Sequence, residues 1–417
     1  MKDLREFTRN SLIYLGSRVA GGALPLLLLP FLVRELGPDE YGKIGLFTAS
    51  FSILMVVIGL GTHGFVRLCY NRSSQKEMRL ILGNATLLIA AMTFACLLIL
   101  LALGQYFDVL RDTYAPYLYL GAVAAIGQKV IELKLALWQM GGKAVKFGFL
   151  TFVATAINIA ASVFLVFVVG MQSEGRIFGM LLPTAIIGPI LLSSMYRGGY
   201  IHFKVDREVL KRILAFGVPL VPHSIALASI IFVERLALSN NPDGSSLGIF
   251  FAAFQLAMPI GIIVNSANLQ FRAWSDKKME DGDHHAVVKA SYALMAVYLI
   301  VGGAYYWVLG FVYPLIVGDA FAEGYPIMGI LILAATFRGF YLVVVKGLFF
   351  AEGTRLLMSI SVFLFVVFSI ILLNFDDLYT VAYLDLAFNV LLFLFVWIAS
   401  AKICPQPWLS FYRTKSS

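Results

Sequence analysis

Charged residues inside long apolar segments are the groups in this sequence whose types and positions could do chemistry. A charged side chain at the centre of a bilayer costs roughly 2.5–3.5 kcal/mol on insertion scales, so it usually faces water, a ligand or an opposite charge. Cations outnumber acids among these residues, which predicts an interior suited to an anionic substrate. The residues are Arg18, Lys129, Glu132, Lys134, Glu234, Arg235, Arg338, Lys346 and Asp385.

Arg338 is the member of this group that most favours a substrate-binding role. It lies about halfway along the apolar segment 325–350, and no acid is close to it in the sequence. Arginine suits phosphate because its planar guanidinium can bind two oxygens at once. We therefore predict that Arg338 lines a cationic cavity. The other residues predicted to bind substrate there are Arg18, Lys129, Arg235 and Arg34.

The intramembrane acids have two alternative roles. Asp385, Glu234 and Glu132 are candidates for ion coupling, since a buried carboxyl group can exchange a proton near neutral pH. The alternative is that each acid pairs with a cation; Glu132 is three residues from Lys129, a spacing that allows an ion pair on one helix face. Lys134 and Lys346 lie within snorkelling reach of a membrane surface, so we interpret them as structural.

Motifs for catalysis and metal binding are missing from the sequence. It contains no GxxxxGK[ST] phosphate loop, no HExxH and no GxSxG. The run Asp281-Gly282-Asp283-His284-His285 resembles a metal site, but we interpret it as a solvated loop. We therefore expect no catalytic residues, no metal and no cofactor. A proton or sodium gradient is the candidate source of energy.

The elements that must position these residues are membrane-spanning helices. The hydrophobic fraction is 60% and the charged fraction 13%, against about 25% charged residues in soluble domains. A helix needs about 20 apolar residues to cross the hydrocarbon core. This criterion predicts about twelve spans, near 10–35, 42–66, 80–104, 114–138, 148–170, 176–196, 213–238, 247–271, 290–317, 325–350, 356–374 and 378–401.

The distribution of Lys and Arg among the connections predicts the orientation. One side of the membrane carries about 22 of them and the other about three, so both termini are expected in the cytoplasm. This placement accounts for the formal net charge of +8 without nucleic acid as a partner. The connections on the outer side are short, for example 240–246 and 375–377, and leave no room for a catalytic domain.

A weak internal repeat predicts two halves. Phe31-Leu32-Val33-Arg34-Glu35-Leu36 at the end of the first span is similar to Phe232-Val233-Glu234-Arg235-Leu236 at the end of the seventh. Both spans also contain Gly and Pro in corresponding positions, which in transporters often marks the moving helices. We predict an all-α membrane protein with two six-helix bundles, at 1–200 and 201–417, related by a pseudo-two-fold axis along the membrane normal.

Three segments of the sequence resemble a known family. The residues Asn10–Tyr14 and Leu29–Gly42, and the second-half segment Phe216-Gly217-Val218-Pro219-Leu220-Val221-Pro222, are similar to Wzx-type O-antigen and polysaccharide flippases. These belong to the multidrug/oligosaccharidyl-lipid/polysaccharide (MOP) exporter superfamily. The resemblance implies two six-helix bundles around a V-shaped central cavity. It also implies flipping of undecaprenyl-pyrophosphate-linked oligosaccharide from the cytoplasmic to the periplasmic leaflet of the bacterial inner membrane.

The expected partners are therefore the lipid bilayer, the lipid-linked oligosaccharide, and a polysaccharide polymerase with its chain-length regulator. One alternative function is a cation-coupled multidrug exporter of the same superfamily. Against it, the first two spans carry no acid at mid-depth. A second alternative is a membrane-embedded glycan polymerase or acyltransferase, which the short outer connections disfavour.

Overall fold

The structure is a computed structural model that describes residues 13–14, 16–17, 21–22, 24–106, 115–241, 244–351 and 353–408. All regular structure in these residues is helical. In order along the chain, the elements are η1 (Leu24–Leu28), α2 (Leu29–Gly59), α3 (Thr62–Tyr70), α4 (Gln75–Tyr106), α5 (Ala115–Met140), α6 (Ala144–Val163), η3 (Phe164–Val168), α7 (Ser173–Arg197), α8 (Arg207–Gly217), η4 (Val218–Leu220), α9 (Val221–Ser239), α10 (Ser245–Glu280), α11 (His284–Val317), η5 (Asp319–Phe321), α12 (Gly324–Phe350), α13 (Thr354–Leu372) and α14 (Leu378–Ile403).

The helices confirm the prediction of a polytopic membrane protein. Within the described residues, ten helical segments are long and apolar enough to cross a membrane. Each predicted span from 42–66 onward coincides with a helix, whereas the span 10–35 lies only partly within the described residues. The first two predicted spans run together because α2 continues through Gly37, where a positive φ of 68° before Pro38 breaks the helical geometry.

Proline also shapes the corresponding positions of the two halves. The 3₁₀ turn η1 contains Pro25, and the 3₁₀ turn η4 contains Pro219. A proline ring removes one backbone donor and crowds the preceding turn, so the α-helical bonding pattern is interrupted there. The Gly and Pro pattern in the sequence thus marks real irregularities in both halves.

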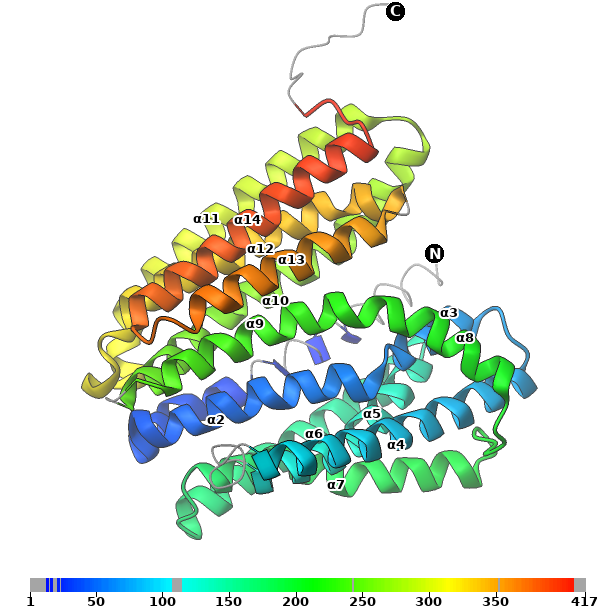
Figure 1. Ribbon diagram of the computed structural model, residues 1–417, viewed down its shortest axis with the longest axis horizontal. Helices are drawn as coiled ribbons and strands as arrows, with labels where there is room; N and C mark the ends of the chain where they lie inside the picture. Colours follow the sequence, from blue (N-terminus) through cyan, green and yellow to red (C-terminus); the bar gives the residue numbers. More distant parts are fainter. Residues whose placement is uncertain are drawn as a thin grey trace, which may run out of the picture. The chain divides into compact units, whose positions relative to one another are not determined.

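The chain divides into two compact units (Figure 1). Unit 1 comprises residues 1–28 and 43–232, and unit 2 comprises residues 29–42 and 233–417. The sequence predicts a division between residues 200 and 201. In the structure residues 201–232 instead pack with unit 1, because α8 lies against α3 and α4.

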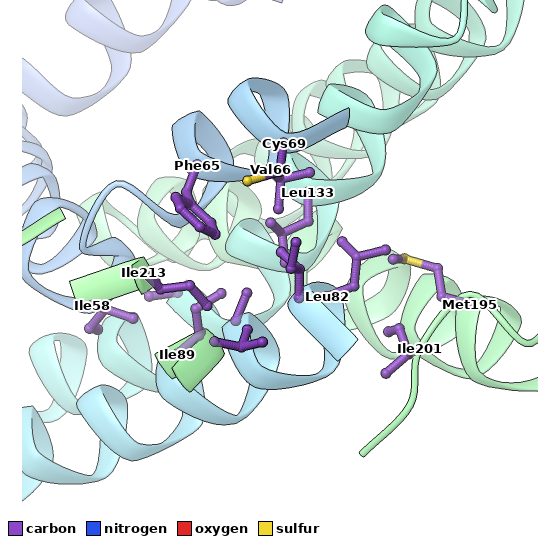
Figure 2. Packing of buried hydrophobic residues seen from close by; sticks show 14 of the residues in the cluster. Ile58, Phe65, Val66, Cys69, Leu82, Ile89, Leu133, Met195, Ile201 and Ile213 are labelled. Carbon is purple, nitrogen blue, oxygen red and sulfur yellow. The ribbon is translucent and has the colours of Figure 1, made fainter. Parts of the chain in front are cut away.

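Unit 1 is built around α5, which contacts α3, α4, α6 and α7. Figure 2 shows the buried side chains of one of its cores converging from several helices. Those labelled there include Phe65, Val66, Leu82, Ile89, Leu133 and Ile213. Membrane helices associate mainly through close van der Waals packing, so this interdigitation holds α3, α4, α5 and α8 together.

Glycine allows α5 and α7 to approach closely within unit 1. A Cβ atom at Gly188 would collide with the Cα atom of Gly127, and one at Gly127 would collide with the carbonyl group of Thr184. Small residues at a helix interface let two backbones pack together in the membrane. This contact fixes the position of α5, which carries Lys129, Glu132 and Lys134.

Unit 2 is built around α12, which packs against α10, α11, α13 and α14. The segment 29–42 joins it through Tyr41, whose hydroxyl donates a hydrogen bond to Gln255 Oε1 at 3.0 Å. The Tyr41 ring also contacts the rings of Phe251 and Phe321. These contacts explain why residues 29–42 group with unit 2 and not with the rest of the first half.

Candidate functional site

Three of the predicted intramembrane charges come together in unit 2. Glu234 of α9 is 1% exposed, and its carboxyl group lies close enough to that of Asp385 on α14 for the two to interact electrostatically. Arg338 of α12 is close enough for its charge to act on both acids. We call Glu234, Arg338 and Asp385 the unit 2 triad.

Like charges on neighbouring carboxyl groups repel, so an opposite charge close by stabilises the two acids of the triad. Asn389, one turn along α14, donates to Asp385 Oδ1 at 2.8 Å and orients that side chain. Arg338 supplies such an opposite charge.

Arg338 has donors left over in this arrangement. Within the described part of the chain it forms neither a hydrogen bond nor an ion pair, and its side chain is half-buried. A guanidinium carries five N–H donors. It can therefore bind an anionic group without first breaking a hydrogen bond to the protein.

A second group of predicted residues comes together in unit 1. Lys129 Nζ lies 2.9 Å from Glu132 Oε2, which confirms the ion pair predicted from their spacing. His63 Nδ1 of α3 lies 3.7 Å from the same Glu132 oxygen. Gly59 leaves room for the lysine, since a Cβ there would lie 2.8 Å from Lys129 Nζ. These residues line a pocket of about 320 Å³.

The remaining predicted cations lie elsewhere. Arg235 is 3% exposed, and its guanidinium stacks over the rings of Phe251 and Phe254 at 4.7 and 5.0 Å. Arg34 is exposed and donates to the carbonyl oxygen of Leu315 at 2.6 Å. Arg18 lies outside the described residues. The structure thus brings Arg338 together with two acids but does not gather the five predicted cations at one place.

The structure places Lys134 and Lys346 in aromatic surroundings. Both are buried, Lys134 beside the rings of Trp138 and Tyr200, and Lys346 3.3 Å from the centroid of the Phe271 ring. Cation–π attraction stabilises both ammonium groups in these positions. The interpretation of the two lysines as structural stays a prediction.

The run 281–285 is a helix cap. Asp283 Oδ1 accepts from the backbone N–H of Ala286, and Asp283 Oδ2 lies 3.2 Å from Lys278 Nζ. The backbone hydrogen bond and the lysine hold the pKa of Asp283 below its usual value. In the residues that the structure describes, no three His, Cys, Asp or Glu side chains are grouped to hold a metal.

The sequence interpretation missed one buried cation. Arg176 counts as an outer-loop residue in the charge pattern, but it lies in the first turn of α7 and is 8% exposed. Its guanidinium donates to Asn158 Oδ1 at 2.6 Å and to Ser162 Oγ at 2.7 Å. The sequence contains a signal for this site, because Asn158 and Ser162 are four residues apart on α6 and therefore share one helix face.

The comparisons with known proteins agree with this fold. A family described as "Polysaccharide biosynthesis protein" matches residues 7–271, more than half of the chain. The chain belongs to this family. A Haemophilus influenzae protein of the Lsg locus is 22% identical over 418 residues, which cover 95% of this chain and 98% of that protein.

Solved structures show the same fold. An inward-facing multidrug resistance MATE family transporter of the MOP superfamily has a TM-score of 0.75 at 12% identity, covering 91% of this chain and 94% of that chain. An outward-facing transporter of the same description has a TM-score of 0.62 at 14% identity, covering 94% and 95%. The protein is thus a multi-pass membrane protein of the polysaccharide flippase and MOP transporter type.

Proposed function

We propose that this protein flips undecaprenyl-pyrophosphate-linked oligosaccharide repeat units from the cytoplasmic to the periplasmic leaflet of the bacterial inner membrane. The observation that carries the proposal is the half-buried Arg338, whose donors have no hydrogen bond or ion pair within the described chain. A pyrophosphate head group supplies the oxygens that a guanidinium binds best. The family assignment supports a glycan as the rest of the substrate.

In this proposal, the unit 2 triad couples substrate binding to the uptake of an ion. Binding of a pyrophosphate at Arg338 would withdraw the positive charge that balances Glu234 and Asp385. The acids would then favour uptake of a proton or sodium ion, so substrate and ion binding are linked through one guanidinium. The route needs no cofactor. In this proposal both termini are cytoplasmic, and a polymerase and chain-length regulator receive the flipped units.

Reconstitution tests the function directly. Purified protein in liposomes should move a fluorescent lipid-pyrophosphate-linked oligosaccharide across the bilayer, and an enzyme acting only from outside should then measure how much remains accessible. A cell lacking the protein should lose surface glycan and accumulate lipid-linked units on the cytoplasmic leaflet. Extension or cleavage of the glycan without movement would contradict the proposal.

A cation-coupled drug exporter is the second candidate, and the fold of the solved multidrug transporters favours it. The same liposomes distinguish the two. An exporter should accumulate a cationic dye against an ion gradient and ignore the lipid-linked glycan. The cationic side chain at Arg338 disfavours a cationic drug there, since like charges repel.

A further inference from the structure

A pocket of about 470 Å³ lies inside unit 1, around Lys134 and its aromatic neighbours. The end of α3, the start of α4, the end of α5 and the residues that follow α5 and α7 form its wall. None of its lining residues is an acid. Its charged and aromatic lining residues are Arg79, Lys134, Lys143, Tyr70, Trp138 and Tyr200.

Lys134 is the central residue of this pocket. It is 8% exposed, and its Nζ lies 4.7 Å from the centroid of the Tyr200 ring and 5.3 Å from that of Trp138. Within the described chain it has no ion pair and no hydrogen bond. Lysines are almost never this deeply buried unless they are paired, so the ammonium lacks the anion that its position calls for.

The surroundings add further positive charge. Lys143 and Lys146 are close enough for their charges to act on Lys134. Glu77, the acid in the first turn of α4, is held by Arg212 at 2.7 Å and does not line the pocket. Ser73 and Gln75 bring the start of α4 to the pocket, and the N-terminus of a helix carries partial positive charge. An anion is the missing partner.

We propose that this pocket binds a phosphorylated sugar. Lys134, Lys143 and Arg79 bind the phosphate group, and the flat faces of Trp138 and Tyr200 pack against the ring. The volume is within the range of about 300–1,000 Å³ usual for small-molecule sites. The ligand is either a sugar phosphate free in solution or the phosphorylated head group of a lipid. The site is separate from the unit 2 triad, so it stands whether or not the protein flips a glycan.

Trp138 makes the site observable. The full-length protein in phosphatidylcholine nanodiscs should show a saturable change in tryptophan emission when titrated with glucose 1-phosphate. Glucose should cause no change, and inorganic phosphate should bind more weakly because it lacks the ring. The variant Trp138→Phe should abolish the response, which assigns it to this tryptophan among the five in the chain.

Variants of the lysines test the contacts. Lys134→Gln should weaken binding about tenfold or more, the size expected from losing a charged hydrogen bond. Lys143→Gln, at an exposed position, should also weaken it without affecting folding. Lys76→Gln is the matched control, because Lys76 is exposed near the start of α4 but does not line the pocket. Glucose 1-phosphate should raise the melting temperature of the parent protein and the control more than that of Lys134→Gln.

Lipid composition distinguishes the two sources of ligand. If a head group is the ligand, nanodiscs containing phosphatidylinositol should alter Trp138 emission without added sugar, and glucose 1-phosphate should reverse the change. Nanodiscs with equally charged phosphatidylglycerol should not. If only glucose 1-phosphate acts, the ligand is soluble. The proposal is overturned if neither probe gives a response that needs Trp138, if inorganic phosphate binds equally well, or if Lys76→Gln weakens binding as much as Lys134→Gln.

Discussion

Arg338 is the residue on which the transport proposal depends most directly. Arg338→Ala should lower surface glycan about tenfold or more, because a charged contact to the head group is lost. The amount of protein in the membrane should stay unchanged, since removing the charge lowers the insertion cost. Arg338→Lys should keep partial function, because it retains the charge without the bidentate geometry. Glycan staining of cells and immunoblots of membranes measure both effects.

If Arg338 has a purely structural role, a different result is expected for the alanine variant. The alanine variant would then leave Glu234 and Asp385 without their compensating charge, and the protein level would fall. Adding Asp385→Asn would restore both level and export. Normal glycan display from Arg338→Ala alone would exclude any substrate contact at this position.

Asp385 tests the ion-coupling part of the proposal. Asp385→Asn preserves the shape of the side chain and its contact with Asn389 but cannot take up a proton. Transport in liposomes should therefore lose its response to an imposed pH or sodium gradient, while the protein remains folded. Asp376→Asn is the control, since Asp376 lies in the exposed turn before α14. If the Asp385 variant responds to the gradient as the parent protein does, the triad takes no part in ion coupling.

The sequence predicts some residue contacts and not others, for a simple physical reason. The Lys129–Glu132 pair depends only on helical spacing, so it could be predicted from the sequence alone. The acids near Arg338 come from α9 and α14, and their approach depends on how three helices pack. The surroundings of Lys134 and Lys346 likewise depend on aromatic residues brought by tertiary packing.

At the scale of the elements, the glycine contact between α5 and α7 is the packing feature most open to test. Gly188→Ala should force the two backbones apart and cost about 1–3 kcal/mol, the range for overpacked interiors. The purified protein should melt at a lower temperature. Gly261→Ala on α10 is the control, because a Cβ there meets no atom within 4 Å. Equal melting temperatures for both variants would show that this interface tolerates expansion.

Helix positions were more predictable than helix contacts. Long apolar runs mark most of the spans because the bilayer sets their length. The predicted span 114–138 coincides with α5, although α5 is not among the ten described segments that are apolar enough to cross a membrane. Pro25 and Pro219 mark the 3₁₀ turns because the ring acts locally. The π-helical turn η3, Phe164–Val168, has no such local signal in its apolar sequence and could not be predicted.

At the scale of the whole molecule, the distribution of basic residues predicts the orientation in the membrane. Reporter domains fused after Ser417 should be cytoplasmic, and those inserted in the turn 239–246 should be periplasmic, because positive connections stay inside. Paired phosphatase and fluorescent-protein fusions measure the two positions. A cytoplasmic signal from the 239–246 fusion would contradict the predicted topology.

The exchange of residues 29–42 into unit 2 has a mechanical consequence. The backbone passes between the units at three places, after residues 28, 42 and 232, where two bundles joined in sequence would need only one. Each place lies in or next to a helix and not in a long loop. If one unit moves against the other during transport, the backbone must adjust at all three of these places.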